Sequence, residues 1–190
     1  VSFNFLREGQ SIQTAYHILK RALGSDYQKT LAAEKTIPGR LKKIVDTIED
    51  ISGLEHFGAY LTLLFEVDAL IANEDRHLNN IAILEENGKY HYCPLFDNGE
   101  GLMLDNVKYP FDVETRGLMK HLRAKPFQCR FGTALSAARD LYGAQLKIAC
   151  SAAEISEIAE KYLDWYQPMF RPFLKERIVD VVLLQMKKYF

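Results

Sequence analysis

Two clusters of polar residues in the middle of the chain hold groups that can bind a metal ion or accept a proton. The first reads NEDRHLNN at 73–80, and the second reads PLFDNGEG at 94–101. Asp75 and Asn80 lie in the first cluster, and Asp97 lies in the second. Two carboxylates and an amide suit a hard cation such as Mg²⁺, which takes oxygen ligands and keeps several waters. Phosphoryl transfer needs such a metal on the phosphates and a carboxylate that accepts a hydroxyl proton.

The residues between the clusters predict a short β-hairpin that brings them together. Residues 81–85 and 90–95 are strand-like runs on either side of ENGK. Asn-Gly between such runs is the strongest short-range signal for a hairpin turn. The two clusters then lie at the open ends of one hairpin, so we expect their side chains to reach a single site.

The rest of the chain is expected to be mainly α-helical. Apolar residues recur at helical spacing over 11–23 and 40–51, which indicates amphipathic helices. Residues 54–72 are apolar nearly all round, which is typical of a buried central helix. The stretch from about 102 to 130 shows no regular pattern. The predicted fold is therefore mainly α with one small β-hairpin.

Helices are also predicted near the C-terminal end of the sequence. Ser151 and Glu154 form a capping-box pattern for a helix near 152–166. Pro172 is suited to the first turn of a last helix that ends near residue 188.

Composition limits the classes of protein that fit. The 190 residues, 48% of them apolar, suffice for a single domain over 1–190 with a sizeable core. A net charge of −1 gives no electrostatic reason to expect nucleic acid or a membrane surface as partner. The widely spaced Cys93, Cys129 and Cys150 do not suggest a disulfide framework or a zinc site. Without a signal peptide or a membrane-length apolar run, we expect a cytoplasmic protein.

The spacing of the polar clusters resembles that of an atypical kinase. Protein kinases space their catalytic base and metal-binding Asn as D-x-x-x-x-N, and a second metal-binding Asp follows in D-F-G. Here DRHLNN has the same spacing, and FDNG stands where D-F-G would. DRHxxN with a later Asp resembles the phosphatidylinositol-kinase and HipA-like families. FEVDALIANEDRHLNNIAIL, CPLFDNGEGL and RAKPF are similar to the bacterial HipA-like kinases, toxin components of toxin–antitoxin pairs.

This resemblance covers roughly residues 1–145 and implies a role for each matched residue. Asp75 matches the catalytic base, and Asn80 and Asp97 match the Mg²⁺ ligands that bind ATP phosphates. His77 matches a loop residue that supports the base or a phosphate, although a plain hydrogen-bonding role fits equally well. Family members are Ser/Thr protein kinases with a helical C-terminal lobe. The implied substrate is a Ser or Thr of a protein, and a helix-turn-helix antitoxin is a candidate partner.

The sequence departs from the kinase pattern in two ways. The D-F-G segment reads DNG, and neither a G-x-G-x-x-G loop nor a strand-borne V-A-I-K lysine is found. NGEG at 98–101 follows the metal site, so it does not suit a loop that covers phosphates. Because the chain opens with Val1, we expect it to be the C-terminal lobe of a longer protein whose N-terminal lobe binds ATP.

Other interpretations of Asp75, Asn80 and Asp97 stay open. They can form an Asx-rich turn network that caps neighbouring elements. The lobe can be a pseudokinase that binds a partner without catalysis. A metal-dependent hydrolase that uses Asp75, His77 and Asp97 is a third possibility.

Charged neighbours of the first cluster have predicted roles as well. Arg76 is expected to pair with Glu74 or Asp97. Asp68 lies on the buried helix, where a charge must be paired, so we expect it to brace the loop rather than react.

Lys125, with Arg123 and Arg130, makes a small basic cluster. We interpret it as a solvated surface. The functional alternative is that it holds a phosphate or an acidic substrate.

Overall fold

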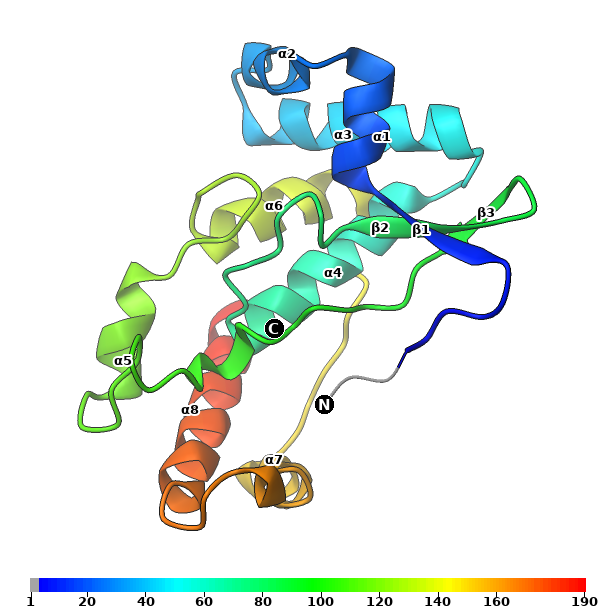
Figure 1. The fold of residues 1–190 in the computed structure, drawn as a ribbon. Helices are drawn as coiled ribbons and strands as arrows, with labels where there is room; N and C mark the ends of the chain where they lie inside the picture. Colours follow the sequence, from blue (N-terminus) through cyan, green and yellow to red (C-terminus); the bar gives the residue numbers. More distant parts are fainter. Residues whose placement is uncertain (1–3) are drawn as a thin grey trace.

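Helices dominate the computed structural model, which describes residues 4–190, and one small sheet accompanies them (Figure 1). The strands are β1 (Gln10–Thr14), β2 (Ala82–Glu86) and β3 (Lys89–Tyr92). The helices are α1 (Ala15–Leu23), α2 (Tyr27–Ala33), α3 (Ile37–Ser52), α4 (Phe57–Ile71), α5 (Thr115–Leu118), α6 (Phe131–Tyr142), α7 (Ala152–Glu160) and α8 (Arg171–Tyr189). Short 3-10 turns are η1 (Gly101–Met103), η2 (Met119–His121) and η3 (Leu163–Trp165).

Helix α4 forms the centre of the fold, as its all-round apolar sequence predicts (Figure 1). It packs against α3, α6 and α8. Its approach to α6 is close, because a Cβ at Gly58 would lie 2.3 Å from the ring of Tyr142. Buried apolar side chains of α1, α3, α4, α6 and α8 share one core with this helix. Among residues 4–190, no helix is both long and apolar enough to cross a membrane.

The predicted hairpin is confirmed, although its second strand ends at Tyr92 and not at residue 95, and it belongs to a larger sheet. Strands β2 and β3 pair antiparallel across a turn in which Asn87 and Gly88 both have positive φ, 52° and 77°. Strand β1 pairs antiparallel with β2, so the order is β1-β2-β3. The helix predicted over 11–23 is therefore wrong at its start. Residues up to Thr14 are strand, and the Thr14 side chain caps α1 by accepting a hydrogen bond from the His17 N–H at 3.3 Å.

The C-terminal helices follow their predicted signals. The Ser151 hydroxyl accepts from the Glu154 N–H at 3.3 Å, and the Glu154 carboxylate accepts from the Ser151 N–H at 2.8 Å. Helix α7 ends at Glu160, earlier than the predicted end near 166, and η3 follows it. Pro172 lies in the first turn of α8, as its position in the sequence predicts.

The segment from 102 to 130 is largely irregular, as expected, but it is firmly attached to the helices. The buried Arg177 of α8 donates hydrogen bonds to the carbonyl oxygens of Tyr109, Pro110 and Val113, at 3.0–3.4 Å. A guanidinium that satisfies several backbone acceptors at once fixes an irregular chain in place, because these carbonyls lack partners in a helix or sheet.

Candidate functional site

Arg76 joins the two polar clusters. Its side chain is 1% exposed, and its Nε and Nη2 donate to the Asp68 carboxylate, both at 2.9 Å. Its Nη1 donates to the carbonyl oxygens of Asn80, at 2.9 Å, and Phe96, at 2.8 Å. Nη2 also donates to the side-chain oxygen of Asn98. One guanidinium therefore ties the residue before β2 to the residues after β3, and the predicted closeness of the two clusters is confirmed.

Asp68 is the anchor of this arrangement, in agreement with its predicted bracing role. Its carboxylate also accepts from the Asn73 amide at 2.7 Å, and the Asn73 side-chain oxygen accepts from the Asp75 N–H at 3.2 Å. Burial raises the pKa of Asp68, while the hydrogen bonds from Arg76 and Asn73 act in the opposite direction. The expected pairing of Arg76 with Glu74 or Asp97 is wrong, because Arg76 pairs with the buried carboxylate of Asp68, which two of its guanidinium nitrogens reach together.

The loop from Asp75 to Asn80 is closed by its own hydrogen bonds. The Asp75 carbonyl accepts from the His77 N–H at 2.7 Å and from the Asn80 side-chain amide at 3.0 Å. The Asn80 N–H donates to the His77 carbonyl at 2.8 Å. These bonds hold Asp75 and Asn80 of the D-x-x-x-x-N pattern in one closed turn, and none of them involves the Asp75 carboxylate.

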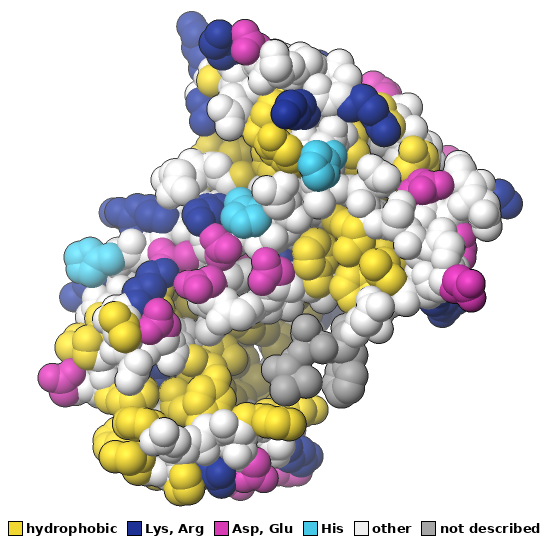
Figure 2. Space-filling model, in the orientation of Figure 1, with side chains coloured by type: hydrophobic (Ala, Val, Ile, Leu, Met, Phe, Trp, Pro, Cys, Tyr) yellow, Lys and Arg dark blue, Asp and Glu magenta, His cyan; other side chains and the backbone are white. Residues whose placement is uncertain are grey.

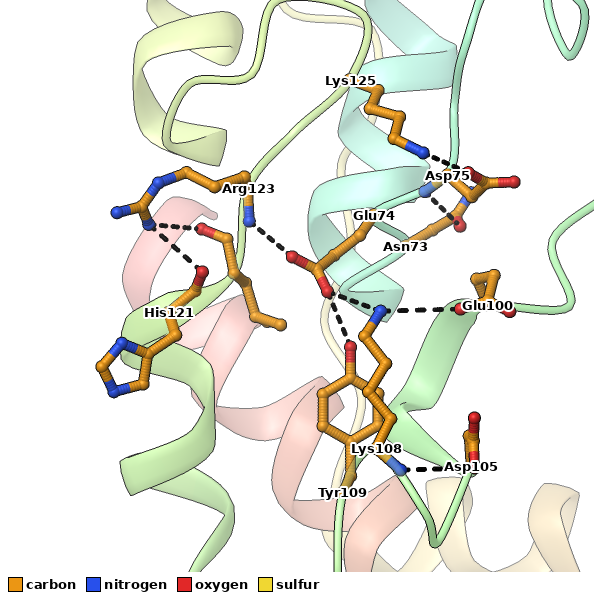
Figure 3. A network of polar contacts seen from close by, with 11 residues as sticks. Asn73, Glu74, Asp75, Glu100, Asp105, Lys108, Tyr109, His121, Arg123 and Lys125 are labelled. Carbon is orange, nitrogen blue, oxygen red and sulfur yellow. Dashed lines mark hydrogen bonds and ion pairs between the residues drawn. The ribbon is translucent and has the colours of Figure 1, made fainter.

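Lys125 faces that carboxylate, with its Nζ 2.5 Å from the Asp75 Oδ1 (Figure 3). Its loop is held by a bridge between Ala124 and Cys129 and by the edge-on packing of Phe127 against a phenylalanine of α4. The interpretation of this cluster as a solvated surface holds for the exposed Arg123 and Arg130, whereas Lys125 is only partly exposed and is paired with Asp75. The RAKPF motif marked the segment, but no local pattern indicates that its lysine reaches a residue fifty positions earlier.

His77 lies on the other side of the same carboxylate. Its Nε2 is 3.6 Å from the Asp75 Oδ2, and its Nδ1 is a buried atom without a hydrogen-bond partner in the described chain. The imidazole therefore lies beside the Asp75 carboxylate, at a distance longer than a hydrogen bond. Asp75 thus has a lysine at one oxygen and a histidine near the other.

Asp97 is exposed and has a positive φ of 54°. It directly follows Phe96, whose carbonyl shares the Arg76 Nη1 with the carbonyl of Asn80, so the backbone at position 80 lies close to the backbone that precedes Asp97. An amide oxygen and a carboxylate oxygen suit Mg²⁺, which commonly takes one or two carboxylates and completes its shell with phosphate and water. Asn80 and Asp97 fit that donor set.

A metal site can also be formed entirely by protein side chains, without phosphate ligands. Within residues 4–190, no group of three or more His, Cys, Asp and Glu side chains is arranged to hold a metal ion. Asp75, His77 and Asp97, the residues of the alternative metal-dependent hydrolase, therefore do not form such a group in the described part of the chain.

Glu74 is the centre of a second network, which the sequence did not predict (Figure 3). Its carboxylate accepts from the Tyr109 hydroxyl at 2.7 Å, from the Arg123 N–H at 2.7 Å and from the Lys108 Nζ at 3.0 Å. Lys108 also lies 3.6 Å from Glu100. Burial acts to raise the pKa of Glu74, but these hydrogen bonds outweigh it and lower the pKa. These contacts hold the irregular segment 102–130 beside the loop that contains Asp75 and Asn80.

A polar pocket of about 380 Å³ opens between these networks. Its lining consists of Glu74, Asp75, Glu100, Lys108, Arg123, Lys125 and Gln128. The pocket lining includes Asp75 but neither Asn80 nor Asp97.

No protein-family model, curated protein or solved structure matches this chain. The arguments about its function therefore rest on the motifs in the sequence and on the geometry described above.

Proposed function

We propose that this chain is the phosphotransferase lobe of a HipA-like protein Ser/Thr kinase. The observation that supports it best is the connection made by Arg76. This buried side chain holds the loop with Asp75 and Asn80 against the segment that presents Asp97. The closeness of the D-x-x-x-x-N loop to the segment that carries Asp97 supports the arrangement that phosphoryl transfer needs.

Each side chain has a definite task in this proposal. Asp75 orients the hydroxyl of a Ser or Thr in a protein substrate and accepts its proton, while Lys125 holds the Asp75 carboxylate and His77 lies beside it. Asn80 and Asp97 would hold Mg²⁺, which when bound compensates the charge of the ATP phosphates. The chain has no glycine-rich phosphate loop, so the proposal assigns the adenine pocket to an N-terminal lobe of a longer parent protein.

Substitution of the two aspartates in the parent protein tests this proposal. Asp75→Asn should lower phosphoryl transfer about 10²–10⁴-fold, because an amide cannot accept the hydroxyl proton. Asp97→Asn should also abolish transfer, because it removes the anionic metal ligand. The measurement is transfer of radiolabel from ATP to the parent protein itself or to a generic Ser/Thr substrate.

The matched control is Asp50→Asn, at an exposed position near the end of α3. It should transfer label like the wild type, and all three variants should keep the wild-type circular dichroism spectrum. If the wild type is active and Asp75→Asn transfers label nearly as fast, the assignment of the base is wrong.

A second candidate is a non-catalytic lobe that binds a partner such as a helix-turn-helix antitoxin. The contact between Lys125 and Asp75 favours it, because a cation at 2.5 Å occupies one oxygen of the carboxylate that would act as base. In this case the wild-type parent shows no transfer of label at all.

Calorimetric titration of the 190-residue chain with Mg-ATP complements the transfer assay. We expect weak or no binding to this lobe, and a dissociation constant in the low micromolar range would contradict its description as half of an ATP site.

A further inference from the structure

One stretch of the irregular segment is strongly basic. Residues 115–130 read TRGLMKHLRAKPFQCR and contain no Asp or Glu, although the whole chain has a net charge of −1. The Lys and Arg side chains of this stretch are Arg116, Lys120, Arg123, Lys125 and Arg130. The excess of positive charge is therefore local, and this stretch includes Lys125, the residue that contacts Asp75.

Most of these cations lack an acidic partner. Lys125 is paired with Asp75, whereas Arg116, Lys120, Arg123 and Arg130 form no ion pair with any described carboxylate. All four of these side chains are exposed. On the face drawn in Figure 2, Lys and Arg side chains gather beside a group of Asp and Glu side chains. Exposed and uncompensated charge of one sign attracts a partner of the opposite sign.

A second pocket, of about 370 Å³, collects three cations from three elements. Lys120 comes from η2, Arg130 precedes α6, and Lys188 comes from the last turn of α8. The other lining residues are Met119, Leu122, Phe131, Gln185 and Tyr189, so no carboxylate lines this pocket. Basic groups next to methionine and aromatic surface suit the carboxylate and the aliphatic stem of an acidic side chain.

This second pocket and the pocket at Asp75 lie along the same segment. Arg123 and Lys125 line the pocket that contains Asp75, and Lys120 and Arg130 line the second one. The buried Leu122 lies between Lys120 and Arg123 in the sequence and fixes the segment to the core. Because residues of one stretch of chain line both pockets, we expect a peptide that lies along this stretch to contact both.

We infer that this basic surface, formed by Lys120, Arg123, Arg130 and Lys188, is the docking site of an acidic peptide segment that presents its Ser or Thr to Asp75. This inference rests on the proposed function and specifies its substrate class. A nucleic acid suits the surface less well, because Glu74, Asp75 and Glu100 at its catalytic end would repel a continuous phosphate backbone. A peptide can hold its carboxylates away from the hydroxyl.

Peptide binding to the 190-residue chain tests the inference without ATP. Fluorescence anisotropy compares a labelled peptide with a Ser and a run of Glu against the same peptide with Gln in place of Glu. The Glu peptide should bind more tightly, and its affinity should fall with added salt because exposed charges are screened. Lys120→Glu/Arg130→Glu should weaken its binding about tenfold, since two attractions become repulsions.

The matched control is Arg21→Glu/Lys35→Glu, which makes the same change of net charge at exposed positions of the α1 end and of the α2–α3 connection. It should bind the Glu peptide like the wild type. If the charge-reversed variant does not fold, Lys120→Gln/Arg130→Gln serves instead and should weaken binding by a smaller factor.

Three results would overturn the inference: equal affinity for the Glu and Gln peptides, wild-type affinity in the folded surface variants, or preference for single-stranded RNA over the Glu peptide. The kinase proposal is judged separately, by label transfer in the parent protein. If the parent protein transfers phosphate but the 190-residue chain binds the Glu and Gln peptides equally, the kinase proposal stands and the docking inference is wrong. Binding of the Glu peptide with loss of affinity in the surface variant, but no transfer, supports this docking surface for a non-catalytic lobe.

Discussion

Two acid–base pairs lie next to each other in the candidate site, and they differ in burial. In the buried pair, Asp68 and Arg76 have side chains that are 3% and 1% exposed. In the open pair, Asp75 and Lys125 have side chains that are 31% and 34% exposed. A buried charge without its partner is strongly destabilising, whereas an exposed pair contributes little because water and salt screen it. We infer that the buried pair holds the site together and the open pair is available for chemistry.

The cations of the two pairs also differ, because Arg76 is fixed by several hydrogen bonds and Lys125 is on a flexible side chain. The planar guanidinium of Arg76 satisfies a carboxylate, two backbone carbonyls and an amide oxygen from both polar clusters. The ammonium group of Lys125 is a compact charge on a flexible stem, and it can shift when a substrate hydroxyl or a phosphate arrives. A lysine at position 76 would not reproduce the forked contacts.

The largest expected effect comes from removing the buried cation. Arg76→Met leaves the Asp68 charge buried without its partner, so the free energy of unfolding should fall by about 3–5 kcal/mol. Urea unfolding followed by circular dichroism measures this change. The control Arg21→Met, at an exposed position of α1, should change stability by no more than about 0.5 kcal/mol. Equal stability of the two variants would show that the buried pair does not hold the site together.

A smaller loss is expected in the network that fastens the irregular segment. Tyr109→Phe removes the hydroxyl that donates to Glu74, and a hydrogen bond to a charged group contributes about 1.5–3 kcal/mol. Because Lys108 and the Arg123 N–H still bind Glu74, we expect the lower end of this range. The control is Tyr162→Phe, at a side chain that is 68% exposed. A loss as small as in this control would mean that the Tyr109 hydrogen bond is exchanged for water without cost.

The third effect is confined to acidic pH and concerns Glu74. Its folded-state pKa is lower than its ordinary value of 4.5, so its ionised form stabilises the fold above that value. This contribution is lost as the pH falls through the folded-state pKa. Glu74→Gln should therefore lose less stability than the wild type when urea unfolding is repeated between about pH 5 and pH 3. The exposed Glu157→Gln control should follow the wild-type pH dependence. A steeper loss in Glu74→Gln would reverse the assigned direction of the shift.

The smallest effect on stability is expected for the open pair. Lys125→Met repeats the substitution made at Arg76, and the free energy of unfolding should change by only about 0–1 kcal/mol. Under the proposed function, phosphoryl transfer by the parent protein should nevertheless fall, because the Asp75 carboxylate loses the cation that orients it. Urea unfolding and label transfer are measured on the same preparation. A loss of stability as large as that of Arg76→Met would erase the distinction between the two pairs.

Local sequence signals determined several features correctly. The Asn87-Gly88 turn accommodates the positive φ angles of a tight hairpin, and the Ser151 capping box satisfies the first amide groups of α7 by itself. The all-round apolar pattern of α4 placed it at the centre, and the need to pair a buried charge indicated that Asp68 braces the loop. Each of these features depends on neighbours in the chain or on a general cost of burial, which a sequence shows directly.

Other features were decided only by the tertiary structure. Strand β1 exists because β2 offers it a ladder of backbone partners from far along the chain, and this outweighs the helical spacing of its side chains. The choice of Asp68 as the partner of Arg76, the contact of Lys125 with Asp75 and that of Tyr109 with Glu74 depend on how the packed helices and the anchored irregular segment lie together. Sequence spacing identifies the groups able to do chemistry, but contacts between distant residues are set by packing, and no local pattern specifies them.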